Sequence, residues 1–143
     1  MKHACIFCRI AAGEIPCTVL DESEHLLAIL DVNPAFPGHT LIIPRAHEEN
    51  IFRADTSVGA ELLDMMRRVG AAVTEATGAT GLNIIQNNGR SAWQTVDHLH
   101  WHLIPRREGD GFEPWKPGIY DSHTQMKTMA EKIRAAMARR RQG

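Results

Sequence analysis

The chain has 143 residues, is 43% hydrophobic and 23% charged, and carries a formal net charge of −1. Its length suits one domain with its own core, and the near-zero charge argues against a bulk nucleic-acid binder or a polybasic membrane protein. No apolar run approaches the length of a membrane span and the N-terminus has no apolar signal segment, so we expect a cytoplasmic protein whose three cysteines serve as metal ligands or free thiols.

Turn-forming residues divide the first third of the chain into short elements. Gly13 and Pro16 end one apolar segment, and Pro37-Gly38 precedes another. An acidic turn over 21–24 separates two further apolar runs. This part therefore predicts a short helix and three strands, over residues 6–12, 17–20, 25–30 and 40–43.

One long helix is predicted in the middle of the chain. From Val58 to Ala76 apolar residues recur at helical spacing, and Gly78 follows as a stop signal. The remaining elements are a strand, a polar loop, a histidine-bearing strand, a second loop and a final helix, over residues 82–86, 87–94, 97–106, 107–120 and about 121–140. This order predicts a single α+β domain, residues 1–143, with an antiparallel sheet on which one long helix and shorter helices pack.

Three histidines alternate with apolar residues near residue 100. Because successive side chains of a strand point to opposite faces, His98, His100 and His102 are expected to share one face while Leu99 and Trp101 enter a core. A row of imidazoles can hold a metal, bind an anion or attack phosphorus. It can also be the wet face of an antiparallel sheet, but three histidines in strict register, out of eight in the chain, favour a functional site.

A second candidate site begins at a C-x-x-C pair. Cys5 and Cys8 could form a redox pair, remain two buried thiols, or bind metal. A metal site needs two further ligands, and His47 and His98 would complete a tetrahedral zinc set of two thiolates and two imidazoles. This interpretation requires that four residues distant in sequence meet in space.

Polar residues before the histidines suggest phosphate recognition. The loop Asn87-Asn88-Gly89-Arg90 and the residues Gln94 and Thr95 offer the donors that phosphate oxygens need, although a polar surface turn would look the same. Asp31 follows an apolar strand and could accept hydrogen bonds from a ribose diol. Its commoner role, in front of Asn33-Pro34, is an Asx turn.

Together these residues resemble the histidine triad (HIT) family of nucleotide hydrolases and transferases, in particular its bacterial HIT-like (Hint-type) proteins. The run 94–106 matches the motif His-x-His-x-His-x-x, with apolar x, and the preceding Gln-Thr-Val. The likeness covers most of a core at about residues 5–106 and leaves the final helix as a C-terminal extension. It implies a HIT-like fold and a homodimer that pairs through the long middle helix and a sheet edge.

The resemblance also implies an activity: hydrolysis at the α-phosphate of a nucleoside phosphoramidate or related purine nucleotide, with AMP as the nucleotide bound. His100 would attack phosphorus and form a nucleotidyl-histidine intermediate, and His98 and His102 would complete the catalytic residues. The nucleotide-binding residues carried over by the match are Ile6, Phe7, Ile10, Asp31, Val32, Asn87, Gln94, Thr95, His100 and His102. Some family members bind a structural zinc, for which the matching residues are Cys5, Cys8, His47 and His98.

One residue departs from the family pattern. The family usually has glycine before the Gln-Thr/Ser-Val run, whereas this chain has Trp93. Tryptophan disfavours the positive φ that glycine permits, so Trp93 could narrow the leaving-group side or stack on a second base or aromatic group. Three alternatives to a phosphoramidase therefore stay open: a dinucleoside polyphosphate hydrolase, a nucleotide-binding module with little catalysis, and a zinc-structured scaffold.

Overall fold

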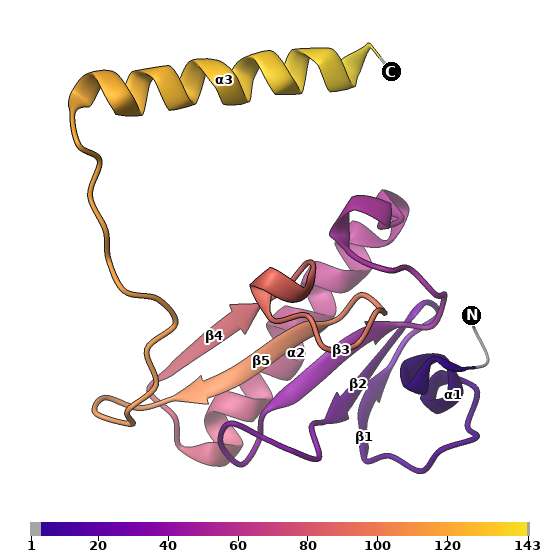
Figure 1. Cartoon of the computed structure of the whole chain (residues 1–143). Helices are drawn as coiled ribbons and strands as arrows, with labels where there is room; N and C mark the ends of the chain where they lie inside the picture. The colour runs from indigo at the N-terminus through magenta and orange to yellow at the C-terminus, as the bar shows by residue number, and fades with distance from the viewer. Residues whose placement is uncertain (1–3, 143) are drawn as a thin grey trace. The chain divides into compact units, whose positions relative to one another are not determined.

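One antiparallel sheet and three α-helices make up the described part of the chain (Figure 1). The structure, a computed structural model, describes residues 4–142 in two units that divide between Asp110 and Gly111. The elements of the first unit are α1 (Ile6–Ala11), β1 (Val19–Glu22), β2 (Leu26–Leu30), β3 (Thr40–Pro44), the 3-10 turns η2 (Ile51–Arg53) and η3 (Thr56–Val58), α2 (Gly59–Thr77), β4 (Gly81–Ile85), η4 (Arg90–Ala92) and β5 (Trp101–Arg106).

The five strands are ordered β1-β2-β3-β5-β4, and every neighbouring pair is antiparallel. The histidine-bearing strand β5 therefore lies inside the sheet, between β3 and β4. Figure 1 shows α2 behind the sheet and α1 on the other side. The predicted α+β class, with an antiparallel sheet and one long helix, is confirmed.

Each face of the sheet has its own apolar core. Against α2 lies a cluster that includes Leu26, Ile42, Met65 and Leu103. Against α1 lies a second cluster, in which Phe7 packs with Leu27, Ile29, Leu41 and Ile43. The alternation of apolar residues along β2 and β3 supplies both clusters, because neighbouring side chains point to opposite faces. The second cluster is the floor on which the candidate site is built.

The long helix α2 ends where the sequence predicts. Gly78 adopts φ 67° and ψ 21°, and its N–H donates to the carbonyls of Glu75 and Thr74. This left-handed cap is a conformation that glycine reaches without a Cβ clash. Gly78, the stop signal predicted from the sequence, thus ends α2 because glycine adopts the left-handed conformation.

The acidic turn predicted over 21–24 is shorter in the structure. Asp21 and Glu22 belong to β1, where they pair with Ala28 and Leu27 of β2. The turn is closed by the N–H of Ser23, which donates to the carbonyl of Leu26. Charged residues were expected in a turn, but β1 is an edge strand, so their side chains reach solvent without leaving the ladder.

The predicted histidine strand was wrong over its first residues. β5 begins at Trp101, so His98 and His100 precede it and only His102 lies in the ladder. The backbone here pairs elsewhere, because the N–H of Leu99 donates to the carbonyl of Glu48 at 2.6 Å. The predicted division of side chains is nevertheless present: Leu99, Trp101 and Leu103 belong to the cluster against α2, and the ring of Phe7, in the cluster against α1, contacts the rings of His98 and His100.

A polar cluster joins the β1–β2 turn to the start of α2. Glu61 accepts hydrogen bonds from the hydroxyl of Ser23, from the N–H of His25 at 2.9 Å and from its Nδ1 at 2.8 Å. The bond from Ser23, followed by those from His25, lowers the pKa of Glu61 to about 2. The same contact with Glu61 raises the pKa of His25.

This cluster predicts a pH-dependent contribution to stability. Glu61, ordinarily at 4.5, stabilises the fold above that pH and loses the effect as pH falls toward about 2, whereas protonated His25 stabilises below 6.5 and loses the effect as pH rises through its raised pKa. We therefore expect Glu61→Gln to lower the melting temperature most near about pH 5–6 and less near about pH 3 or 9. Thermal denaturation of both proteins across this range is the measurement, and a difference that stays constant with pH would contradict it.

The second unit contains α3 (His123–Arg141), close to the predicted helix over about 121–140. Ser122 caps it, since its hydroxyl oxygen accepts from the N–H of Gln125 at 3.0 Å. The last turn carries Arg139, Arg140 and Arg141, which suit the negative end of the helix dipole. Of the helices within residues 4–142, none combines the length and the apolarity needed to cross a membrane.

Candidate functional site

A pocket of about 420 Å³ opens between α1, the end of β2 and the segment before β5. Eight of the ten predicted nucleotide-binding residues line it: Ile6, Phe7, Ile10, Asp31, Val32, Thr95, His100 and His102. The other two, Asn87 and Gln94, are not among its lining residues. Ile15, Pro16 and Cys17 also line the pocket, although the sequence analysis did not include them among the nucleotide-binding residues. Apolar side chains from α1 and β2 thus meet polar groups from the triad segment in one cavity.

His100 lies against this pocket with its protonation pattern set by the backbone. The ring is 5% exposed, and its Nδ1 lies 2.7 Å from the carbonyl oxygen of His98. A carbonyl only accepts, so Nδ1 carries the proton and Nε2 keeps its lone pair. Burial lowers the pKa of His100, which keeps the ring neutral near pH 7. The edge of the ring packs against Phe7, with centroids 5.1 Å apart. A neutral imidazole with a free Nε2 is a nucleophile.

His102 has the opposite pattern, and His39 is the reason. The N–H of Ala35 donates to Nδ1 of His39 at 2.9 Å, so His39 carries its proton on Nε2. That Nε2 lies 2.9 Å from Nδ1 of His102 and donates to it, which leaves the proton of His102 on its own Nε2. Burial, followed by the charges of His100 and His39, lowers the pKa of His102 to about 4. His102 is therefore a neutral hydrogen-bond donor beside a neutral imidazole, His100, whose Nε2 keeps its lone pair.

His39 is a site residue to which sequence reasoning assigned no role. It lies in the Pro37-Gly38-His39 stretch that carries part of the family likeness, but its partner His102 is 63 positions later in the chain. The only local signal was its place between a turn and a buried strand. Its ring is buried, with Nε2 also 3.6 Å from Oδ2 of Asp31. His39 does not line the pocket and contacts it through His102, whose ring it orients.

Asp31 forms the Asx turn considered from the sequence and keeps one carboxylate oxygen outside that turn. Its Oδ1 accepts the N–H of Asn33 at 2.8 Å, which forms the Asx turn. Its Oδ2 is the oxygen near His39, and the side chain lines the pocket. The turn therefore orients the carboxylate without using both oxygens, and Oδ2 has lone pairs for a ligand hydroxyl.

The loop before the triad is shaped by Gln94. This side chain is 3% exposed, and its Oε1 accepts the N–H of Gly89 at 2.8 Å. Its Nε2 donates to the carbonyls of Glu49 at 2.7 Å and Val96 at 3.1 Å. The amide thus binds backbone on both sides, so it maintains the loop from which Thr95 reaches the pocket.

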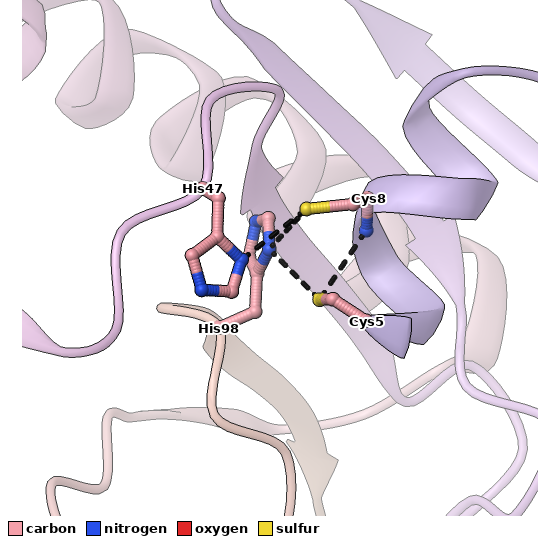
Figure 2. A group of neighbouring side chains, drawn as sticks. All are labelled: Cys5, Cys8, His47 and His98. Atoms are coloured by element: carbon pink, nitrogen blue, oxygen red, sulfur yellow. Dashed lines mark hydrogen bonds between the residues drawn. The ribbon is translucent and has the colours of Figure 1, made fainter. Parts of the chain in front are cut away.

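The four predicted metal ligands meet in one cluster. Figure 2 shows Cys5, the N-cap of α1, and Cys8, within α1, approaching His47 and His98. All four candidate ligand atoms lie within 4.8 Å of one another. Sγ of Cys5 is 3.3 Å from Nδ1 of His98, and Sγ of Cys8 is 3.2 Å from Nδ1 of His47 and 3.5 Å from Nδ1 of His98. Sulfur and nitrogen ligands of a tetrahedral zinc lie about 3.5 Å apart, so these positions fit that ion.

The protonation of His98 also fits a metal. Its Nε2 lies 2.8 Å from the carbonyl oxygen of Pro44 and must donate to it. Nδ1 is then unprotonated and faces the two sulfur atoms (Figure 2). A backbone carbonyl that orients a ligating imidazole in this way is a usual outer contact of zinc sites.

The sequence profile of the HIT domain matches residues 12–109, more than half of the chain. The chain belongs to the HIT family. A HIT family protein from Bacillus subtilis has the same fold, with a TM-score of 0.85, 35% identity, and coverage of 92% of this chain and 96% of that one.

Two further HIT relatives bear on the site. The adenosine 5′-monophosphoramidase of Schizosaccharomyces pombe is 38% identical over 131 residues, which cover 91% of this chain and 96% of that protein. The crystal structure of a zinc-bound histidine triad family protein from Mycobacterium smegmatis aligns with a TM-score of 0.73 and 33% identity, and covers 95% of this chain and 99% of that one.

Proposed function

We propose that this HIT protein is a nucleoside phosphoramidase that cleaves the bond between an α-phosphate and its leaving group through a nucleotidyl-histidine intermediate on His100. The observation that carries the proposal is the pair His100 and His102, one with a free Nε2 and one with a protonated Nε2, lining the same pocket. The similar S. pombe protein, named an adenosine 5′-monophosphoramidase, supports the bond type and the purine nucleotide.

The two ends of the pocket suit the two ends of AMP. The apolar side chains of Ile6, Phe7 and Ile10 provide a surface for a purine ring. Asp31, with Val32 beside it, would accept hydrogen bonds from the ribose hydroxyls through Oδ2. This arrangement brings the α-phosphate toward His100 and Thr95.

The reaction then follows from the two protonation patterns. Nε2 of His100 donates its lone pair to phosphorus, the phosphorus–nitrogen bond to the leaving amine breaks, and the proton on Nε2 of His102 moves to that amine. Water then attacks phosphorus, the phosphorus–imidazole bond breaks, and one proton of the water returns to Nε2 of His102, which releases AMP and restores both histidines. Asn87, Gln94 and Thr95 would position the phosphate or its loop, and His98 would act on His100 through its backbone carbonyl.

We further propose a structural zinc on Cys5, Cys8, His47 and His98, for which the cluster fits and which the zinc-bound relative supports. The ion would fix α1 against the triad segment and takes no part in the steps above. A homodimer also stays a prediction: β4 is an edge strand and could pair with a second copy. Light scattering that gives a monomer mass would refute the dimer.

Turnover of adenosine 5′-phosphoramidate tests the activity. We expect ³¹P NMR to show its conversion to AMP. Intact-mass analysis of rapidly quenched enzyme should show one covalent AMP per chain, and this adduct should be lost in acid. Adenylyl sulfate and a dinucleoside polyphosphate complete the substrate panel. If calorimetry shows AMP binding while none of the three is turned over, the proposal is wrong and a nucleotide-binding module with little catalysis takes its place.

A further inference from the structure

Trp93 has a backbone conformation that its side chain opposes. With φ 68° and ψ 25°, it is the one non-glycine residue at positive φ among residues 4–142. A bulky side chain is strained there, whereas glycine is not. Backbone strain of this kind persists where the surroundings impose it, and it occurs most often at functional sites.

The surroundings of Trp93 do impose this conformation. Its own N–H donates to the carbonyl of Arg90 at 3.0 Å, and the N–H of Gln94 donates to the carbonyl of Gly89 at 3.1 Å. The side chain of Gln94 binds Gly89 again from within the loop. These bonds set the turn without any contribution from the indole, so the loop requires a left-handed residue at position 93 but not a tryptophan.

Packing does not explain the tryptophan either. Its side chain is 80% exposed, so it adds little to either core. A second exposed aromatic residue belongs to the segment beside this loop: Phe52 is 83% exposed, and its neighbour Ile51 donates its N–H to Oδ1 of Asn88 at 2.8 Å. Large apolar surface left in water next to a pocket is typical of a surface that contacts a ligand.

The position of Trp93 along the chain places it close to Thr95, at the end of the pocket to which the proposed function assigns the phosphate. It precedes Thr95 by two residues, a span of at most about 7 Å between Cα atoms. Thr95 lines the pocket together with His100 and His102, whereas the residues assigned to the base come from α1. Figure 1 shows η4, which Trp93 follows directly, between the end of β4 and the start of β5. In the proposed reaction, a leaving group that extends beyond the phosphate on this side would approach Trp93.

We propose that Trp93 determines leaving-group specificity by stacking its indole on a flat aromatic ring of the group that departs from the α-phosphate. This inference rests on the proposed function. The ring could belong to an aromatic amine or to the second base of a dinucleoside polyphosphate, and both offer the same π-face. An offset stack favours such rings over saturated ones of similar size.

A pair of matched substrates tests the stacking. Adenosine 5′-phosphoramidates of 2-phenylethylamine and 2-cyclohexylethylamine differ in the aromaticity of the ring and little in size. We expect wild-type kcat/KM to favour the phenyl substrate by about 3- to 10-fold. Trp93→Leu and Trp93→Gly should bring the ratio close to one, and Trp93→Phe should keep part of the preference. Because the phenyl-to-cyclohexyl ratio of kcat/KM is taken within each variant, a general loss of activity from a damaged loop affects both substrates equally and leaves the ratio unchanged.

Diadenosine tetraphosphate identifies the source of the ring. If kcat/KM for this dinucleotide falls in Trp93→Leu more than for adenosine 5′-phosphoramidate, the natural ring is a second base; if only the phenyl preference is lost, it belongs to an amine. A phenyl-to-cyclohexyl ratio and a dinucleotide preference that are both unchanged in Trp93→Leu would overturn the proposal. Failure of the proposed function looks different, since the wild type would then turn over none of these substrates.

Discussion

His100→Ala is expected to lower kcat for adenosine 5′-phosphoramidate by about 10⁴- to 10⁶-fold, the usual cost of removing a nucleophile. The ring supplies the only lone pair that the hydrogen bonds of the triad leave unprotonated toward the pocket, because Nδ1 is bound to the carbonyl of His98 and Nε2 of His102 carries a proton. The covalent AMP adduct should disappear with it. Single-turnover rates and quenched-enzyme mass spectra measure both effects.

A second histidine provides the control for this variant. His123 begins α3 and is not among the residues that line the pocket, so His123→Ala is a matched loss of one imidazole. Circular dichroism and zinc analysis should find the fold of His100→Ala intact, and calorimetry should still show AMP binding. Turnover by His100→Ala within about tenfold of the wild type would mean that another group attacks phosphorus.

Cys8→Ser is expected to abolish stoichiometric zinc binding and to lower the melting temperature by about 10 °C. Cys8 lies near both imidazole nitrogens of the cluster, so its loss removes a ligand from the middle of the set. Structural zinc stabilises small sites by several kcal/mol, and about 3 kcal/mol corresponds to roughly 10 °C for a domain of this size. Elemental analysis and thermal denaturation, with and without a strong chelator, are the measurements.

Cys17→Ser is the matched control for the zinc experiment, because Cys17 lies outside the cluster and the substitution is the same. It should retain one zinc per chain and the chelator sensitivity of the wild type. A wild-type protein that purifies from zinc-supplemented medium without zinc, or a Cys8→Ser variant whose melting temperature equals that of the wild type, would contradict the proposed zinc site.

Residues whose environment is local were predictable from the sequence. The spacing of apolar residues in α2 and the glycine at position 78 place that helix within a residue at each end. The start of β5 could not be predicted in this way, because the backbone of Leu99 bonds to Glu48, a residue about fifty positions earlier. The same limit applies to His39, whose function appears only when β3 lies beside β5.

The candidate site divides in the same manner. Alternation alone predicted that the rings of His100 and His102 share a face, and they do, with centroids 5.0 Å apart. Convergence of Cys5 and His98 depends on how α1 packs across the sheet, which no local pattern contains. The difficulty of a tryptophan at position 93 was visible in the sequence, but the bonds of Gln94 that impose the conformation were not.

The protonation patterns of His100 and His102 are set by main-chain groups. The carbonyl of His98 accepts a hydrogen bond from Nδ1 of His100 and so keeps the proton of that ring on Nδ1. The N–H of Ala35 donates to Nδ1 of His39, whose Nε2 donates to Nδ1 of His102, so the proton of His102 stays on Nε2. Two imidazole side chains thus present different nitrogens to the pocket: Nε2 is unprotonated in His100 and protonated in His102. The difference between His100 and His102 therefore depends on loop geometry. A change that rotates the peptide carbonyl of His98 or the peptide N–H of Ala35 would move the proton to the other ring nitrogen, even if every histidine were retained.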